Sequence, residues 1–337
     1  MRIIQSTKET VRRFTSVFDD GSDKDLSRIA SDHLSSDFLW RGMYPFYEVS
    51  GPEGVVESFW LPLRKSLHSL QRREDIFFAG LNDVDGGQST WTCSMGHFMG
   101  LFDTDFLGIP KTGRLASLRY AEFMRVDGDQ ILESAFFFDL IGLMQQAGVY
   151  PLPPMTGNYF VYPGPLTHDG QQVDECDPRE TTKTIALVNE MIEDLRSINH
   201  LDDEPCPPDL LRRTWHEDML WYGPSGIGAT YTIPRYQKQH QFPFRMNVTE
   251  KVYNGHVARI AEGNYCGFFG WANLTNRNRG GFLGLPAARE PSDMRIVDIY
   301  RRQDDKLAEN WVFIDIPHYL NQQGLDVLAR LRELGST

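Results

Sequence analysis

The stretch that decides the fold occurs twice in this chain. Residues 119–148 read RYAEFMRVDGDQILESAFFFDLIGLMQQAG, and residues 295–324 read RIVDIYRRQDDKLAENWVFIDIPHYLNQQG, which align without a gap at a shift of 176 positions. The identical pairs are Arg119/Arg295, Arg125/Arg301, Asp129/Asp305, Glu133/Glu309, Phe137/Phe313, Asp139/Asp315, Gln146/Gln322 and Gly148/Gly324. Such self-similarity predicts two copies of one domain.

Shorter blocks outside this stretch repeat in the same order. FLGIP at 106–110 matches FLGLP at 282–286, GHFMGLF at 96–102 matches GNYCGFF at 263–269, and GPEGVVESFWLP at 51–62 matches GPSGIGATYTIP at 223–234. The last two blocks align at shifts of 167 and 172. Residues 148–172 are dense in Pro and Gly and have no helical or alternating period. We therefore predict a boundary near Pro165, with domains 1–164 and 165–337.

Each copy reads as helix first and strands later. Residues 9–18 and 181–198 place apolar side chains three and four positions apart, which indicates amphipathic helices. Residues 76–102 and 114–139 are rich in aromatic and β-branched residues and contain Asp-Gly pairs typical of hairpin turns. This order predicts the α+β class, with a curved antiparallel sheet packed on helices around a concave pocket.

Strand alternation places two ionisable residues of the first copy on comparable faces. Side chains two apart share a face, so His97 lies with Trp91, and Asp139 lies with Phe137. If both faces line the concave side, a carboxylate and an imidazole enter one apolar cavity. Burial would raise the pKa of Asp139 toward that of a general base. The alternative is structural: Asp139 precedes LIGLMQQAG and suits a helix N-cap, and His97 suits a hydrogen-bonded core position.

The second copy carries a related set on its own strands. The same counting groups His256 with Asn264 on one strand, and Trp311, Phe313 and Asp315 on another. In the alignment Asn264 occupies the position of His97, and an amide donates hydrogen bonds but takes no proton at neutral pH. The two pockets are therefore expected to differ in acid-base chemistry, and the first copy is the better catalytic candidate.

The motifs of the first copy resemble those of a known family. The series GH..G.F.....GIP.TGR at 96–114, a strand ending in Asp139 and then GLMQQAGV is similar to the SnoaL-like polyketide cyclases of the nuclear-transport-factor-2-like superfamily. The resemblance implies a cone-shaped α+β barrel with a deep apolar pocket in each copy. It further implies a cofactor-free intramolecular aldol ring closure, with Asp139 as acid/base, His97 as a pocket residue and Asp315 as the second copy's counterpart.

Composition limits the partners of the chain. A net charge of −12 is opposite in sign to what nucleic acid or an anionic membrane attracts, so a small apolar organic substrate is expected instead. The four cysteines lack C-x-x-C spacing, and neither a metal site nor a cofactor motif is evident. With no signal-peptide pattern at its start, the chain is expected to be cytoplasmic. The fused copies are expected to imitate a dimer within one chain, with association into a homodimer as the alternative.

Two functional hypotheses follow from these residues. The first is a cofactor-free acid-base enzyme acting on an apolar carbonyl compound, or a hydratase, dehydratase or isomerase of the same superfamily. Its catalytic residues would be Asp139, His97 and Asp315, and its substrate-binding residues would be Trp40, Trp91, Phe137, Asn264, His256, Trp311 and Phe313. The second is a non-catalytic module that binds a small molecule or a protein partner, in which both aspartates only cap helices.

Overall fold

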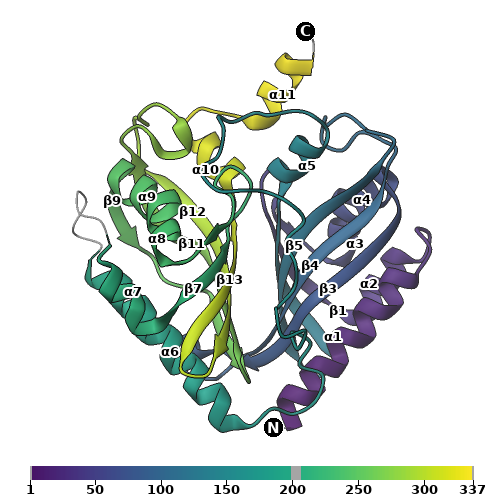
Figure 1. Ribbon diagram of the computed structural model, residues 1–337. Coiled ribbons are helices and arrows are strands. Elements are labelled where there is room, and N and C mark those ends of the chain that lie inside the picture. Colours follow the sequence, from purple (N-terminus) through teal and green to yellow (C-terminus); the bar gives the residue numbers. More distant parts are fainter. Residues whose placement is uncertain (1, 199–205, 336–337) are drawn as a thin grey trace. The chain divides into compact units, whose positions relative to one another are not determined.

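The chain forms two compact units in a computed structural model that describes residues 2–198 and 206–335 (Figure 1). The first unit contains residues up to 149, residues 163–175 and residues from 328 onward. The second contains residues 150–162 and 176–327. The sequence boundary between residues 164 and 165 therefore falls inside a segment that belongs to the first unit.

The first unit packs helices against a six-stranded sheet with the order β2-β1-β6-β5-β4-β3 (Figure 1). Helix α1 contacts four of these strands through an apolar stripe that includes Val11, Phe14 and Phe18. The elements are α1 (Arg2–Asp20), α2 (Leu26–His33), β1 (Leu34–Gly42), β2 (Tyr47–Ser50), α3 (Pro52–Val55), η1 (Val56–Trp60), α4 (Leu61–Ser66), β3 (Leu67–Leu81), η2 (Asp83–Asp85), β4 (Thr90–Phe102), β5 (Leu115–Asp127), β6 (Gln130–Phe138) and α5 (Leu140–Gln146).

The second unit repeats this plan with the sheet order β10-β11-β12-β13-β7-β8, and β9 pairs with β11. Its long helix α6 contacts β10 and β11. The elements are α6 (Pro178–Ser197), α7 (Pro208–Thr214), β7 (Trp215–Tyr222), β8 (Thr230–Tyr231), α8 (Ile233–Tyr236), η3 (Gln237–Gln241), α9 (Phe242–Asn247), β9 (Val248–Tyr253), β10 (Ala258–Glu262), β11 (Tyr265–Asn278), η4 (Phe282–Gly284), β12 (Ser292–Gln303), β13 (Lys306–Ile314) and α10 (Ile316–Gln322); α11 (Val327–Gly335) follows.

The predicted α+β class is confirmed, with one difference in the sheets. Each sheet is mixed rather than antiparallel, because β1 runs parallel to β6 and β7 runs parallel to β13. These parallel pairs arise because the chain crosses from the first strand to the last of each copy through helices and hairpins, whereas consecutive long strands pair as hairpins. Among the described residues neither sheet closes into a barrel.

The gapless repeat that opened the sequence corresponds to equivalent structure. The hairpin of β5 and β6 and the hairpin of β12 and β13 match at the same shift, and α5 and α10 begin and end at equivalent positions. The identical Gln146 and Gln322 explain part of this likeness. Each side chain exchanges two hydrogen bonds with the backbone of the preceding hairpin, at Ser117 or Asp293. Both copies therefore fasten the last helix to the sheet in one way.

The alignment of the GHFMGLF block is wrong in register. Trp91 pairs with Arg125, and Tyr265 pairs with Arg301, which is the equivalent of Arg125. The two strands therefore match at a shift of 174. Asn264 precedes β11 in a turn, where its Oδ1 accepts a hydrogen bond from Arg302 Nη2 at 2.7 Å, and it does not occupy the position of His97. Shared glycines had dominated the sequence match.

The alignment of the GPEG block is also displaced. The run α3-η1-α4 and the run α8-η3-α9 have equal lengths at a shift of 181, and the middle piece of each is a π-helix. Each run begins after a residue with positive φ, Gly51 at 81° and Thr232 at 68°. Glycine adopts this backbone conformation without steric cost, whereas threonine adopts it at some cost. Because the second copy has threonine at this position, no glycine in its sequence marks the start of the run.

Candidate active site

In each unit a cavity lies between the sheet and the first long helix. The cavity of the first unit has a volume of about 20 Å³ and contacts Phe14 and Phe18 of α1. The cavity of the second unit has a volume of about 210 Å³ and contacts Met191 and Ile192 of α6. The second copy thus carries the larger of these two cavities, whereas the sequence comparison favoured the first copy.

Smaller side chains at equivalent strand positions open the second cavity. In the first unit Phe136 stacks on Tyr120, with ring centroids 5.8 Å apart and planes 5° from parallel. The residues at the equivalent positions of the second unit are Val312 and Ile296, and both line the 210 Å³ cavity. Each aromatic ring fills volume that an aliphatic side chain leaves empty. The first unit is therefore closely packed at the place where the second unit has its cavity.

A carboxylate lies at the same position in both copies. It is Glu122 in the first unit, where Arg72 Nη1 lies 3.5 Å from Glu122 Oε2 and Ser134 Oγ donates to Oε1 at 2.7 Å. Arg72 itself is held by the Asp19 carboxylate. The ion pair and the tight aromatic packing tie this carboxylate into the core.

The carboxylate of the second unit, Asp298, has no such cation. Its Oδ1 accepts hydrogen bonds from Tyr300 Oη at 3.1 Å and Asn310 Nδ2 at 3.2 Å, and within the described residues no Lys or Arg pairs with it. Tyr253 occupies the position that Arg72 has in the first copy. Tyr253 pairs across the sheet with Leu274, Arg72 pairs with Phe98, and these two partners are equivalent. Burial against the cavity raises the pKa of Asp298 to about 6.

Two histidines line the same cavity as Asp298. His240 lies in the π-helix η3 and stacks on Trp221, with ring centroids 4.0 Å apart. His256 stacks on Phe268 at 3.9 Å, and its Nε2 lies 3.3 Å from Tyr253 Oη. Burial lowers the pKa of each imidazole to about 3. Both rings are therefore neutral at physiological pH and can act as hydrogen-bond donors or acceptors.

Asp139 and Asp315 both cap helices in this structure. Asp139 Oδ1 accepts from the Gly142 amide at 3.0 Å, and Asp315 Oδ1 accepts from the His318 amide at 3.1 Å. Asp315 Oδ2 also lies 3.7 Å from Arg295 Nη1. Neither aspartate lines the cavity of its own unit, because both follow strand positions on the sheet face opposite the helices.

His97 also lies outside the cavity of the first unit. It pairs across the sheet with Arg119, and its Nδ1 lies 3.6 Å from Asp75 Oδ2. Burial lowers the pKa of His97, with a further contribution from Arg73 and Arg119. Burial also raises the pKa of Asp75 to about 6. The expectation that His97 and Asp139 look into one concave pocket therefore differs from the structure, in which the pocket opens on the other face.

The predicted substrate-binding residues divide between the two faces. Trp40 lines the small cavity of the first unit, and His256 lines the cavity of the second. The side chains of Trp91, Phe137, Trp311 and Phe313 are buried but lie on the opposite face of their sheets. Asp298, Tyr300 and His240 were not singled out from the sequence. Both faces of these strands are buried, so alternation alone does not tell which face meets the helices.

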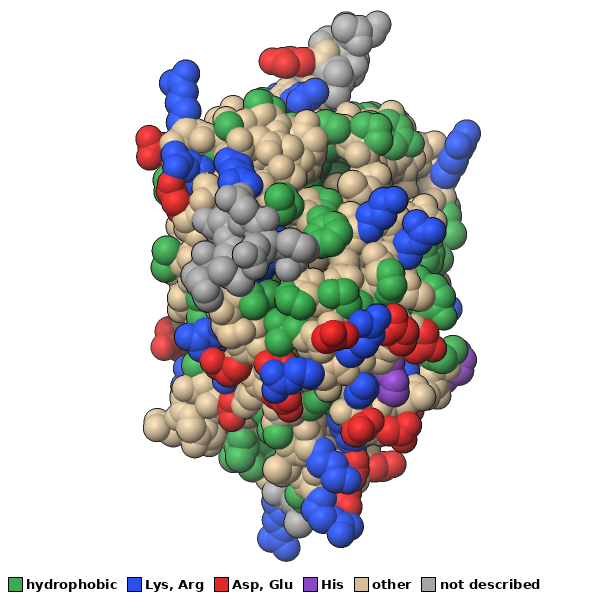
Figure 2. Space-filling model, turned by 60° about the vertical axis from the view of Figure 1, so that its left-hand side comes forward, with side chains coloured by type: hydrophobic (Ala, Val, Ile, Leu, Met, Phe, Trp, Pro, Cys, Tyr) green, Lys and Arg blue, Asp and Glu red, His purple; other side chains and the backbone are tan. Residues whose placement is uncertain are grey.

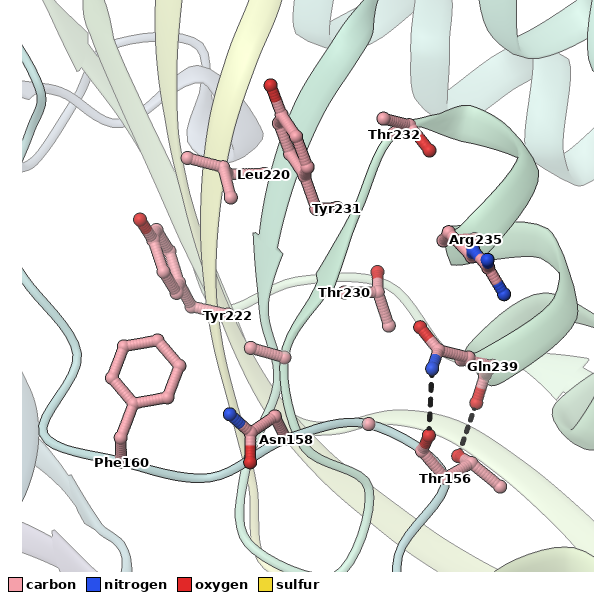
Figure 3. A pocket seen from close by; sticks show the side chains of 12 residues that line it. Thr156, Asn158, Phe160, Leu220, Tyr222, Thr230, Tyr231, Thr232, Arg235 and Gln239 are labelled. Atoms are coloured by element: carbon pink, nitrogen blue, oxygen red, sulfur yellow. Dashed lines mark hydrogen bonds between the residues drawn. The ribbon is translucent and has the colours of Figure 1, made fainter.

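A second, open groove lies on the second unit (Figure 3). It has a volume of about 620 Å³ and is lined by Tyr222, Tyr231 and Phe160 together with hydroxyl and amide side chains. Thr156 and Gln239 exchange hydrogen bonds at one side of it, as the dashed lines in Figure 3 show. The lining contains Arg235 but no carboxylate or histidine, so its composition suits binding rather than proton transfer.

The surface and the helices add two observations. Figure 2 shows acidic and basic side chains interspersed on the face that it draws. None of the helices in the described ranges is long and apolar enough to cross a membrane. Within residues 2–198 and 206–335, we also find no group of three or more His, Cys, Asp or Glu side chains placed to hold a metal ion.

Solved structures of other proteins are similar to parts of this chain. A candidate SnoaL-like polyketide cyclase from Jannaschia sp. CCS1 is 19% identical, with 46% of this chain and 97% of that chain covered and a TM-score of 0.34. IdmH, a candidate polyketide cyclase from Streptomyces antibioticus, is 17% identical, with 42% and 97% covered and a TM-score of 0.33. An NTF2-like protein from Burkholderia xenovorans LB400 is 15% identical, with 42% and 95% covered and a TM-score of 0.32.

The other comparisons give no match. No protein-family model matches the chain, and no curated protein matches it. The solved structures named above each match less than half of this chain.

Proposed function

We propose that the second unit is a cofactor-free acid-base enzyme that binds a small apolar carbonyl compound in the 210 Å³ cavity. The observation that carries the proposal is Asp298, a carboxylate that pairs with no Lys or Arg of residues 2–198 and 206–335 and whose pKa of about 6 lies close to physiological pH. A general base works best when its pKa is near the working pH, because it is then both deprotonated and basic enough.

The size and lining of the cavity limit the ligand. A dry cavity of about 150 Å³ accepts a benzene-sized molecule. The larger cavity of the second unit, lined by Val312, Ile314 and Leu274, therefore suits a compound of about two fused rings. The lining also carries polar side chains, Asp298 and the cationic Arg196 and Arg245 among them, and these would orient one oxygen and one acidic C–H bond.

The reaction step follows from this arrangement. The Asp298 carboxylate removes a proton from the carbon next to the carbonyl group, and the C–H electron pair moves to form an enolate whose charge rests on the oxygen. The protonated carboxyl then returns the proton. Tyr300 and Asn310 hold the carboxylate in place by donating to one oxygen, Oδ1. An aldol ring closure and an isomerisation both begin with this step.

Proton exchange tests the proposal without knowledge of the natural substrate. We expect the wild-type protein to accelerate exchange of the acidic C1 protons of 2-tetralone with D2O, followed by proton NMR. The variant Asp298→Asn keeps the shape of the side chain and removes the base, so the acceleration should fall at least about 100-fold. The surface variant Asp129→Asn serves as the control, since this side chain is 90% exposed.

The variants Asp139→Asn and Asp315→Asn separate the two candidate carboxylate positions. Both should keep most of the acceleration, because these aspartates cap helices outside the cavity. If Asp139→Asn removes the exchange and Asp298→Asn keeps it, the proposed site is wrong. If 2-tetralone binds but no variant changes its exchange, the unit is a binding module of the kind that the open groove also favours.

A further inference from the structure

We infer that His240 recognises the oxygen atom of the ligand by donating a hydrogen bond from Nε2. This inference rests on the proposed function, because it assigns a partner to the carbonyl group on which Asp298 would act. Three independent features of the structure lead to it: the position of the residue in the fold, its stacking on Trp221 and the environment of its two ring nitrogens.

The position of His240 differs between the copies in a way that points to a ligand. The π-helices η1 and η3 are equivalent, and the residue at the place of His240 in the first copy is Phe59. Phe59 lies 5.1 Å from Trp40, as His240 lies beside Trp221. A phenyl ring therefore satisfies the packing of this fold, and packing alone gives no reason for an imidazole. Extra residues of the π type are frequent at functional sites.

The stacking fixes the plane of the imidazole. The rings of His240 and Trp221 lie 19° from parallel, and the ring centroid of Phe244 lies 6.1 Å from that of His240. Because the ring is held between aromatic neighbours, its two nitrogens keep fixed directions. A donor fixed in this way loses little conformational entropy when a ligand binds.

The environment of the ring nitrogens indicates which one carries the proton. Nδ1 of His240 is buried and has no hydrogen-bond partner in the described part of the chain. Nε2 is not among the buried unpartnered atoms, and since the ring lines the cavity, we assign its accessible edge to the cavity. A proton on Nδ1 would leave a buried N–H without an acceptor, which costs more than an unpaired lone pair on the ring. We therefore place the N–H on Nε2.

A neutral donor at this place suits an enolate oxygen. Burial keeps the pKa of His240 at about 3, so the imidazole stays neutral while Asp298 is ionised. The neutral ring then polarises the carbonyl group. An imidazolium would instead place a positive charge near the Asp298 carboxylate and make it a weaker base. A hydrogen-bond donor held where negative charge develops stabilises that charge more than it stabilises the ground state.

The test compares two probes that differ in one oxygen. 2-Tetralone and tetralin share the bicyclic skeleton, and only the ketone can accept a hydrogen bond. We expect wild-type protein to bind the ketone about tenfold more tightly in ligand-detected NMR titrations, which is the value of one good hydrogen bond. His240→Phe should abolish this preference while still binding tetralin, and it should slow ketone proton exchange. His240→Gln, which keeps an N–H donor, should retain part of both.

Controls and contrary results separate this inference from the proposed function. His216→Gln, at a half-buried histidine that does not line the cavity, should keep the wild-type preference. If wild type binds the two probes equally, or binds neither, the inference is overturned. If Asp298→Asn abolishes proton exchange while His240→Phe keeps both the binding preference for the ketone and the acceleration of its proton exchange, Asp298 is the base and the proposed role of His240 is wrong. Thermal unfolding of each variant shows whether it is folded, and the Phe side chain at the equivalent Phe59 indicates that His240→Phe will be.

Discussion

At the scale of single residues, the carboxylates that the two copies share have unlike roles. Asp139 and Asp315 are identical in the repeat and cap equivalent helices, so their identity reflects local helix chemistry. Glu122 and Asp298 differ in residue type but occupy one strand position. Glu122 pairs with Arg72, whereas Asp298 faces an open cavity. The environment of the position, rather than the identity of its residue, separates a structural from a chemically available carboxylate.

The raised pKa of Asp298 predicts a pH dependence of stability. Its pKa is about 6 in the folded protein and 3.8 as a reference, so the folded state binds this proton more tightly. Stability is therefore highest below pH 4 with respect to this group and declines as the pH rises through 6. The difference in pKa corresponds to about 3 kcal/mol.

Urea unfolding of wild type and Asp298→Asn at several pH values measures this effect. The variant has no titrating carboxyl at this position. The free energy of unfolding of wild type should therefore fall relative to that of the variant between pH 4 and pH 7, and the difference between the two proteins should stay constant above pH 7. Parallel curves for the two proteins would show that Asp298 titrates normally. Acceleration of proton exchange by wild type should follow the opposite trend and rise with pH through about 6.

At the scale of elements, the strands β6 and β13 explain why one copy is filled and the other hollow. They have equal length and equivalent pairing, yet Phe136 and Phe138 face the helices in the first copy and Val312 and Ile314 in the second. The π-helices contribute Phe59 and His240 in the same way. Identical backbone elements can therefore form a core in one unit and a cavity in the other.

Filling the second cavity from its strand tests this account. Val312→Phe introduces the side chain that the first copy has at Phe136, so we expect the cavity to close and the binding of both 2-tetralone and tetralin to weaken at least about tenfold. Weaker binding of both probes distinguishes this variant from His240→Phe, which should lose only the binding preference for the ketone. Val252→Phe, at a strand residue that is 57% exposed, is the control. Unchanged probe binding by a folded Val312→Phe would mean that the probes bind elsewhere.

At the scale of the whole molecule, the chain between the copies is divided between the units. Residues 150–162 belong to the second unit and residues 163–175 to the first. Lys8 of α1, which is 1% exposed, donates to the carbonyl oxygens of Gln172 and Asp174, and Phe77 of β3 exchanges backbone hydrogen bonds with the same segment. The segment after the sequence boundary is thus part of the first unit's hydrogen-bonded structure.

Replacing the buried ammonium group tests how this segment is held. Lys8→Met keeps the length of the side chain and removes two charge-assisted hydrogen bonds, so the amides of residues 170–173 should exchange with D2O at least about tenfold faster. Hydrogen exchange with mass spectrometry on the full chain measures this, with Lys24→Met, at an exposed lysine, as the control. Equal protection in both variants would show that the backbone bonds to Phe77 suffice.

By itself, the sequence determined the duplication and the α+β class, and it offered a helix cap as one of two roles for Asp139. These depend on local spacing, on turn chemistry and on a gapless repeat, all of which are written along the chain. Only the tertiary structure decided which sheet face meets the helices, because the strands are apolar on both faces and alternation is then uninformative. It also decided the register of β11 and the place of His240. The register of this 14-residue strand follows from its pairing with β12, and the place of His240 follows from the π-helix η3; shared glycines in the sequence indicated neither. The candidate site moved from Asp139 to Asp298 for that reason.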